Sequence, residues 1–268
     1  MKFTKILVAG SNSYIATETL PHLTLGNGQI YFATRTTTPK NDQADRLGAI
    51  PIEIQDYGSP EALDSLLKAL NLESGDSLLI LNFIGDFGSI VSPVELDLNT
   101  FLEEFQGNVN PFLVFTKLLK FAGPRSLYIN FSGAGIGGSN LDLSSPSYLA
   151  AKSVIVFLTE AFDHNLKSTG KRIAAVAPGA FPSKMQAIVA NSEPGEHLSV
   201  DRINAAKKTM TDSTHSEKLI GLLNFLIDNP DRAGGRVWSA NFDNFDKTVP
   251  LGEFGRLRRV IKFLDESN

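Results

Sequence analysis

Residues 5–16 read KILVAGSNSYIA, and this stretch decides the fold class. The apolar run that ends at Ala9 predicts a buried strand, and the spacing of apolar residues over 15–25 predicts a helix directly after it. Gly10, three small polar residues and Tyr14 join the two. Glycine permits the tight turn, and free N–H groups at the start of a helix attract a pyrophosphate. The stretch therefore predicts a dinucleotide-binding turn, with a serine-capped helix after an ordinary strand as the alternative.

Working outward, the same alternation of short apolar runs and helical segments fills most of the chain. Because the strands are apolar almost throughout, we expect them to be buried on both faces of a sheet. The pattern predicts one α/β domain over 1–268, with a doubly wound (Rossmann) parallel sheet of about seven strands and helices on both faces. The predicted strands are 5–9, 29–33, 49–54, 77–82, 126–131, 172–177 and 236–240, and the predicted helices are 15–25, 60–70, 98–122, 146–167 and 217–227.

The segment 181–214 interrupts this alternation. It is polar, contains Pro182, Pro194 and Gly195, and has only weak helical patches. A long irregular insertion in an α/β domain is usually functional. We expect a lid over a substrate, with a solvated surface excursion as the alternative.

Composition excludes several classes of function. The chain has 268 residues and no cysteine, which removes disulfides, thiol nucleophiles and cysteine-based metal sites. Its four histidines show no HExxH spacing, so we predict no catalytic metal. The net charge of −4 argues against nucleic acid as a partner.

The apolar runs are too short for a membrane span or a secretory leader, so we expect a cytoplasmic protein without a membrane partner. The segment 255–264 mixes four basic residues with apolar ones. Such a helix can contact phosphates or a membrane surface, but a solvated face is the better interpretation in an acidic chain.

Three positions bear on the cofactor. Thr34 stands at the end of the second predicted strand, where an acidic residue would bond the ribose hydroxyls of NAD. Arg35 follows it and can pair with a 2′-phosphate. NADP is therefore favoured, with NAD and a merely solvated arginine left open. Tyr14 replaces a glycine of the usual turn pattern and could crowd the cofactor.

Tyr148 and Lys152 form the candidate catalytic pair. They are four residues apart at the start of a predicted helix and so share one face. A phenol with a pKa near ~10 exchanges protons poorly at neutral pH, and a nearby ammonium lowers that pKa. Tyr148 could then pass a proton to or from a substrate oxygen, and Ser132, at the end of the preceding strand, could hydrogen-bond the same oxygen.

In their order and spacing, these segments resemble the short-chain dehydrogenase/reductase family over nearly the whole chain. The resemblance implies hydride transfer between NADP(H) and an alcohol or carbonyl substrate, with Tyr148 as the general acid/base and Ser132 and Lys152 beside it. It also implies that Asp56 holds the adenine amino group and Ser183 the carboxamide. The cofactor-binding residues that it implies are Gly10, Ser11, Asn12, Ser13, Tyr14, Ile15, Arg35, Asp56, Tyr57, Asn82, Ile84, Gly85, Tyr148, Lys152, Pro178, Gly179 and Ser183.

The resemblance places a fourth catalytic residue, an asparagine, at a bend in the long helix over 98–122. Pro111 cannot donate to the carbonyl of Gly107, so we expect the helix to bend beside Asn108. In the family this site anchors a water that links the lysine to solvent. Asn110 is the competing candidate, and a bend with two surface asparagines is the plain alternative.

The glycine-rich loop over 133–138 resembles one bacterial branch of the family, as does the segment 235–243, and the branch hints at a carbohydrate-like substrate. If the serine role has moved, Ser139 or Ser144 could serve.

Two other functions remain: a non-catalytic NADP-binding regulator, and an epimerase or dehydratase with tightly held cofactor. The helices 98–122 and 146–167 carry apolar residues on several faces, which predicts a homodimer or homotetramer.

Overall fold

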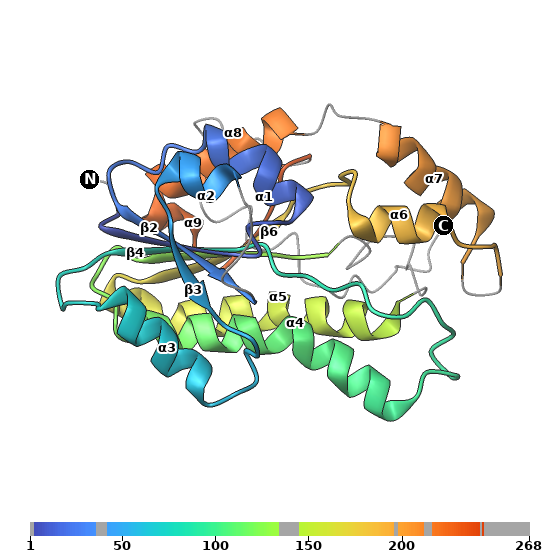
Figure 1. The fold of residues 1–268 in the computed structure, drawn as a ribbon, viewed down its shortest axis with the longest axis horizontal. Coiled ribbons are helices and arrows are strands. Elements are labelled where there is room, and N and C mark those ends of the chain that lie inside the picture. Colours follow the sequence, from blue (N-terminus) through green and yellow to red (C-terminus); the bar gives the residue numbers. More distant parts are fainter. Residues whose placement is uncertain are drawn as a thin grey trace, which may run out of the picture.

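The computed structural model describes residues 3–35, 42–133, 145–195, 198–211, 216–241 and 243. These residues contain a seven-stranded parallel sheet in the order β3-β2-β1-β4-β5-β6-β7, which confirms the predicted doubly wound fold (Figure 1). Because the order reverses between β1 and β4, a crevice is expected beyond their carboxyl ends. The strands are β1 (Lys5–Ala9), β2 (Gln29–Thr34), β3 (Ile50–Glu53), β4 (Leu78–Asn82), β5 (Leu127–Phe131), β6 (Arg172–Ala177) and β7 (Val237–Ser239).

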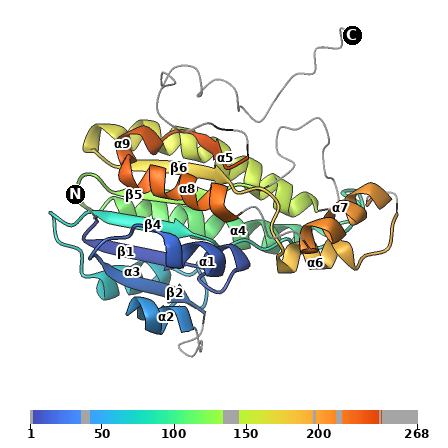
Figure 2. The ribbon, with the colours of Figure 1, turned by 90° about the horizontal axis from the view of Figure 1, so that it is seen from above.

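Helices cover both faces of the sheet (Figures 1 and 2). One layer holds α1 (Tyr14–Thr19), α2 (Asp42–Leu47), α8 (Ser216–Asp228) and α9 (Pro230–Ala233). The other holds α3 (Glu61–Leu70), α4 (Leu98–Leu119) and α5 (Pro146–Leu166). A third group, α6 (Lys184–Ala190) and α7 (Val200–Thr211), extends beyond the end of the sheet, as Figure 2 shows from above. Two 3₁₀ turns, Leu20–His22 and Lys167–Thr169, follow α1 and α5.

Alternation along each strand fills a separate core on each face. In β1, Ile6 and Val8 join the cluster under α1 and α8, whereas Leu7 and Ala9 join the cluster under α3, α4 and α5. Successive side chains of a strand point to opposite faces, so a strand buried on both sides must be apolar at every position. The two cores fix the strands from both faces, and because the strands are parallel, their carboxyl ends lie at the same edge of the sheet.

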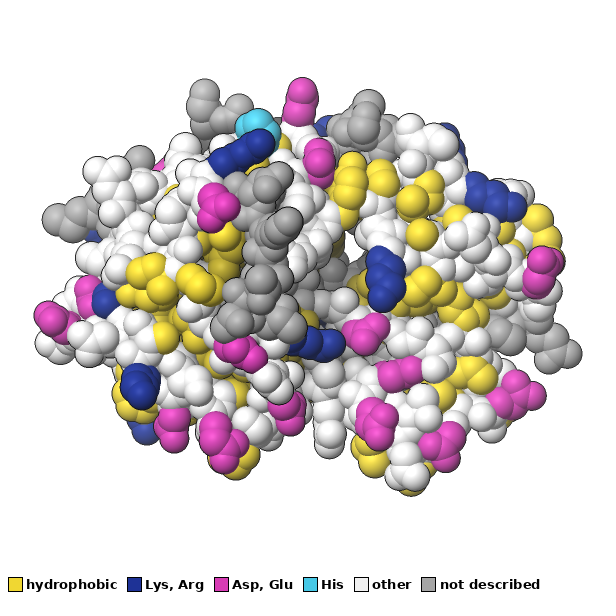
Figure 3. Space-filling model, in the orientation of Figure 1, with side chains coloured by type: hydrophobic (Ala, Val, Ile, Leu, Met, Phe, Trp, Pro, Cys, Tyr) yellow, Lys and Arg dark blue, Asp and Glu magenta, His cyan; other side chains and the backbone are white. Residues whose placement is uncertain are grey.

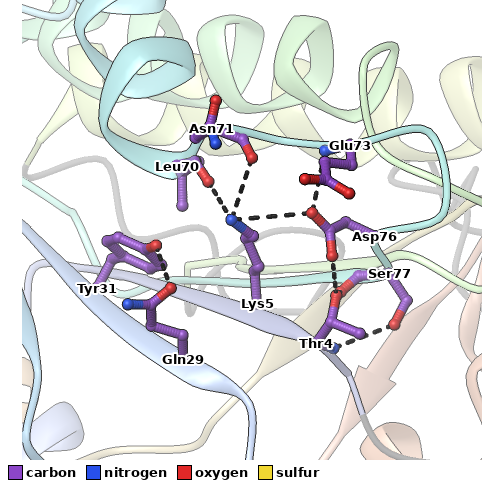
Figure 4. Close-up of polar contacts among 9 residues, drawn as sticks. All are labelled: Thr4, Lys5, Gln29, Tyr31, Leu70, Asn71, Glu73, Asp76 and Ser77. Carbon is purple, nitrogen blue, oxygen red and sulfur yellow. Dashed lines mark hydrogen bonds and ion pairs between the residues drawn. The ribbon is translucent and has the colours of Figure 1, made fainter.

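The amino ends of the strands are tied together by a polar network (Figure 4). The ammonium of Lys5 donates to the carbonyls of Leu70 and Asn71 and lies 3.8 Å from the carboxylate of Asp76. Asp76 in turn accepts from the backbone N–H of Glu73 (3.0 Å) and the hydroxyl of Thr4 (2.9 Å). These hydrogen bonds, the one from Glu73 above all, lower the pKa of Asp76. The network joins β1 to the end of α3 and the approach to β4.

The structure corrects the predicted secondary structure in two regions. The helix predicted over 15–25 ends at Thr19 and continues only as a 3₁₀ turn, because Pro21 has no N–H to donate to the preceding turn. The segment 181–214 contains the helices α6 and α7 rather than weak helical patches. Neither is apolar enough to stand alone, and tertiary packing stabilises both. The short helices α2 and α9 were not predicted, and the other predicted elements agree within three residues at each end.

Candidate active site

The turn after β1 lies against the loop after β4. Gly10 has a φ of +72°, and a Cβ on it would lie 2.8 Å from the backbone nitrogen of Ile84. Only glycine fits there. Ser13 donates its N–H to the Gly10 carbonyl (3.0 Å), and its hydroxyl accepts from the N–H of Ala16 (3.2 Å), which caps α1.

Three further residues of the turn differ in exposure. Ser11 is buried, Asn12 is exposed, and Ile15 is half-buried against the core. The ring of Tyr14 lies 6.5 Å from that of Phe181, at the start of the predicted lid. The tyrosine in the glycine position is thus packed beside a buried aromatic residue.

The ends of β2 and β3 bring together the residues predicted for the adenosine side. Arg35 is exposed directly after β2. Burial raises the pKa of the Tyr57 hydroxyl, and the charge of Arg35 opposes that rise, so the two groups lie within electrostatic reach. Asp56 is exposed, and one of its carboxylate oxygens accepts from the N–H of Gly58 at 2.6 Å.

Asn82 holds the loop after β4 from beneath. Its amide nitrogen donates to Asn130 Oδ1 (2.7 Å) and to the Tyr128 hydroxyl (3.1 Å), and its Oδ1 accepts from the N–H of Ile84 (3.1 Å). The amide nitrogen of Asn130 is buried without a partner among the described residues, and so is the hydroxyl of Tyr57. This network connects β4 and β5 directly to the loop that carries Gly85.

Tyr148 and Lys152 are both buried, with 7% and 3% of their surface exposed. The Lys152 ammonium lies 5.6 Å from the centre of the Tyr148 ring. Burial lowers the pKa of Lys152 to about 8 and raises the pKa of Tyr148. The sequence predicted that the lysine would lower the pKa of the tyrosine. In the structure burial shifts this pKa in the opposite direction, because it removes most of the phenol from water.

The hydroxyl of Tyr148 lies against the loop after β5. A Cβ on Gly133 would lie 2.8 Å from this hydroxyl and 2.7 Å from the ring, so the loop leaves no room for a side chain. Ser132 precedes this glycine and is buried. The structure therefore brings the loop that carries Ser132 to the reactive end of Tyr148.

The surroundings of Gly85 show which of the two candidate asparagines lies beside Lys152. A Cβ on Gly85 would lie 3.6 Å from Lys152 Nζ and 4.0 Å from Asn108 Oδ1, so these two side chains meet beside it. Asn110 instead lies next to Gly58, where a Cβ would be 2.8 Å from its amide nitrogen. Asn108 is thus the asparagine beside the lysine, and α4 continues through Pro111 as one element.

The residues after β6 lie near the end of β7. Pro178 is buried, and Gly179 has a φ of +94° with the amide of Asn241 close beside it. Ser183 caps α6, its hydroxyl accepting from the N–H of Gln186 at 3.3 Å. The cap fixes where α6 begins.

The helices α6 and α7 share a buried hydrophobic cluster with the candidate catalytic tyrosine. The ring of Phe87, in the loop after β4, lies 5.5 Å from that of Tyr148. Sequence reasoning missed Phe87, since an isolated phenylalanine in a loop has no periodic signal. The other buried members of this cluster are Val189, Ala190, Leu198, Ile203 and Ala206. On the face drawn in Figure 3, hydrophobic side chains also gather over α6 and α7, where Ile188, Val200 and Met210 are exposed.

Several predictions lie outside the described residues. They are the glycine-rich loop over 134–138, the alternatives Ser139 and Ser144, Phe242 within the segment 235–243, and the basic segment 255–264. In the described ranges, no three His, Asp or Glu side chains are grouped as a metal would require. None of the helices there combines the length and hydropathy needed to cross a membrane.

No family model matches the chain. Over 216 residues it is 26% identical to a protein from Stachybotrys chartarum named short-chain dehydrogenase/reductase SAT3, covering 66% of this chain and 80% of that one. A short-chain dehydrogenase/reductase structure from Saccharomyces cerevisiae aligns with a TM-score of 0.75 and 16% identity, over 92% of this chain and 100% of the other. A short-chain dehydrogenase from Burkholderia cenocepacia in complex with NADP aligns with a TM-score of 0.67 and 20% identity, over 90% and 98%.

Proposed function

We propose that the chain is a short-chain dehydrogenase/reductase, the family to which its sequence and fold are similar, and that it interconverts an alcohol and a carbonyl with NADP(H). The observation that carries this proposal is the burial of Tyr148 and Lys152 together, beside Gly85 and Asn108, at the carboxyl edge of the sheet. Burying a hydroxyl and an ammonium costs folding free energy that apolar side chains at the same positions would not cost. Buried titratable groups of this kind cluster at functional sites.

The residues at this edge fit a dinucleotide. The glycine at position 10 lets the turn after β1 lie against the backbone of the loop after β4. Arg35 is exposed at the end of β2 with no carboxylate paired to it among the described residues. Arg35 would hold the 2′-phosphate, Asp56 the adenine, and Lys152 the ribose next to the nicotinamide. When bound, NADP(H) supplies or accepts the hydride. The structurally similar dehydrogenase from Burkholderia cenocepacia is in complex with NADP, which supports the choice of this cofactor.

Tyr148 would donate the proton during reduction. Burial raises its pKa and so keeps the hydroxyl protonated at neutral pH, but it also makes the phenol a weaker acid, so transfer of the proton to the carbonyl oxygen would depend on charges that stabilise the phenolate. The positive charge of Lys152 stabilises the phenolate left behind. Ser132 would hydrogen-bond the same substrate oxygen and orient it, and oxidation would run through the same groups in reverse.

The surroundings of Tyr148 favour an apolar substituent on the substrate carbonyl. Phe87 and the lid residues Val189 and Leu198 belong to the cluster that covers the tyrosine. A polyhydroxylated group would lose its hydrogen bonds to water against such side chains without replacing them. We therefore favour an alkyl or aryl carbonyl over the carbohydrate-like substrate that the bacterial branch suggests.

The protein is also proposed to form a homodimer or homotetramer through α4 and α5. Most of the apolar residues of α4 that suggested this, such as Phe112 and Phe115, are buried within the subunit. Phe157 on α5 remains 69% exposed, and Leu98 and Leu102 are exposed on α4. Light scattering at micromolar concentration measures the mass. A monomer would contradict the proposal.

A substrate panel with NADPH tests the function. Alkyl, aryl and sugar-derived carbonyl compounds are offered, and oxidation of NADPH is followed by its absorbance. We expect turnover of apolar carbonyls. Binding of NADPH without turnover of any compound would instead favour the non-catalytic regulator.

Calorimetric titration tests the choice of cofactor. A charge-assisted arginine–phosphate pair contributes roughly 1.5–3 kcal/mol, so NADP(H) should bind about 10- to 150-fold more tightly than NAD(H). Arg35→Ala should remove that preference and leave NAD(H) affinity unchanged. Equal affinity of the unaltered protein for both cofactors would refute the assignment of Arg35.

A further inference from the structure

Glu104, on α4, receives three hydrogen bonds from two other elements. One carboxylate oxygen accepts from the backbone N–H of Ser89 (2.7 Å) and from its hydroxyl (2.5 Å). The other accepts from the hydroxyl of Ser147. Ser147 is fully buried and directly precedes Tyr148 in the first turn of α5. The carboxylate therefore joins α4, the loop after β4 and the start of α5.

Asn108, one turn further along α4, holds the same loop. Its amide nitrogen donates to the carbonyl of Asp86 (2.9 Å) and to that of Glu104 (3.0 Å), and its Oδ1 accepts from the N–H of Asp86 (3.2 Å). Residues four apart share a helix face. One face of α4 thus clamps the loop at Asp86 and at Ser89, on either side of Phe87.

Two further contacts close this arrangement around Tyr148. The hydroxyl of Ser145 donates to the carbonyl of Phe87, whose ring lies against Tyr148. Gly88 has a φ of +71°, and a Cβ on it would collide with the Glu104 carboxylate and lie 3.0 Å from the Ser147 hydroxyl. The loop is therefore held too tightly at this point to admit a side chain.

We infer that Glu104 is a positioning residue for Tyr148, acting through Ser147 on one side and through Ser89 and Phe87 on the other. The inference rests on the proposed function in taking Tyr148 as the proton donor. A carboxylate suits this role because all three partners donate and both of its oxygens accept. Glutamine offers one accepting oxygen only, and a side chain of equal length without polar atoms offers none.

The first test compares Glu104→Met with Glu104→Gln, using Glu103→Met as the matched control on the exposed face of the same helix. A misplacement of about 1 Å at a reacting group costs up to about 100-fold in rate. We expect Glu104→Met to lower kcat about 10- to 100-fold, with KM for NADPH changed less than about threefold. Glu104→Gln should recover part of the loss, and Glu103→Met should behave as the unaltered protein.

A double-mutant cycle identifies the route of the effect. If Glu104 acts through Ser147, then Glu104→Met should lower kcat less in a Ser147→Ala background than in the unaltered protein. Equal effects in both backgrounds would overturn the Ser147 route, and an unchanged kcat in Glu104→Met would overturn the inference itself.

A spectroscopic test needs no turnover. The chain has five tyrosines, so protein labelled with 3-fluorotyrosine should give five ¹⁹F resonances, of which Tyr148→Phe identifies one by its loss. Glu104→Met should move the Tyr148 resonance and leave that of Tyr31, at the opposite end of the sheet, in place. A Tyr148 resonance that does not move overturns the inference even if the protein proves not to be a reductase. A resonance that moves while Tyr148→Phe keeps full turnover upholds the positioning and overturns the proposed function alone.

Discussion

Two lysines at opposite ends of the sheet have opposite surroundings. Lys5, at the amino end, donates to two carbonyls and lies beside the Asp76 carboxylate. Lys152, at the carboxyl end, is 3% exposed, and within the described ranges its ammonium has no hydrogen-bond or ion-pair partner. The ammonium of Lys5 thus joins several segments of the fold, whereas the ammonium of Lys152 lies beside the ring of Tyr148 with no hydrogen bond or ion pair among the described residues.

This difference indicates how the molecule divides stability from function. A paired polar group at the amino end contributes to stability, because its hydrogen bonds replace those lost to water. A buried ammonium without a partner costs free energy, and that cost lowers the pKa of Lys152 to about 8. Such a group is available to a ligand. We therefore expect substitutions at the carboxyl end to change activity and those at the amino end to change stability.

The largest effect is expected from Tyr148→Phe, which removes one hydroxyl and keeps the ring. Turnover should fall by about 10²–10⁴-fold, the usual contribution of general acid–base catalysis, with NADPH affinity and thermal stability nearly unchanged. Steady-state kinetics measures turnover, and calorimetry measures NADPH affinity and thermal stability. The control is Tyr31→Phe, which removes a hydroxyl bonded to Gln29 at the other end and should leave turnover unaltered. Full turnover by Tyr148→Phe would refute the mechanism.

An intermediate effect is expected from Lys152→Met on the pH dependence of stability. The folded pKa of about 8 lies below the unfolded value of 10.5, so the unfolded chain binds more protons between them and stability rises with pH there. From about pH 7.5 to about pH 9.5, this group should add about 2 kcal/mol to the free energy of unfolding. Lys152→Met should abolish that rise, gain stability at neutral pH and lose activity.

Urea unfolding at the two pH values measures the difference, and Lys5→Met is the control. Lys5→Met should lower stability at both pH values and leave turnover intact, since it removes paired hydrogen bonds. If Lys152→Met destabilised the protein at neutral pH, the ammonium would have a favourable partner and the contrast between the two ends would fail.

The smallest effect is expected from Asp76→Asn at the amino end. Loss of the charge that receives the bonds of Thr4 and Glu73 should lower the free energy of unfolding by about 1 kcal/mol, without a change in turnover. Because the pKa of Asp76 is lowered on folding, this stabilisation is complete above the unfolded pKa of about 3.9 and is lost as the pH falls through the folded value. Urea unfolding at neutral pH and below about pH 3 compares the stability of Asp76→Asn with that of the unaltered protein. A difference that persists in acid would contradict the role of the charge.

The alternation of apolar runs was enough to predict the sheet, because strands buried on both faces must be apolar and the helices between them must carry one apolar stripe. The turn at Gly10 and the spacing of Tyr148 and Lys152 could also be read locally. Parallel strands deliver their following loops to one edge, so residues placed just after strands meet there. Hence Gly85, Ser132 and Tyr148 could be assigned to one site without a structure.

What only the tertiary structure decided depends on contacts between segments far apart in the chain. Local sequence cannot distinguish Asn108 from Asn110, because which of them reaches Lys152 depends on how α4 lies against the loop after β4. The helices α6 and α7 have weak patterns of their own and are stabilised by burying Val189 and Ile203 in the cluster that also contains Tyr148. The same packing removes water from the tyrosine and raises its pKa, since desolvation is a property of everything that surrounds a group and not of its neighbours in sequence.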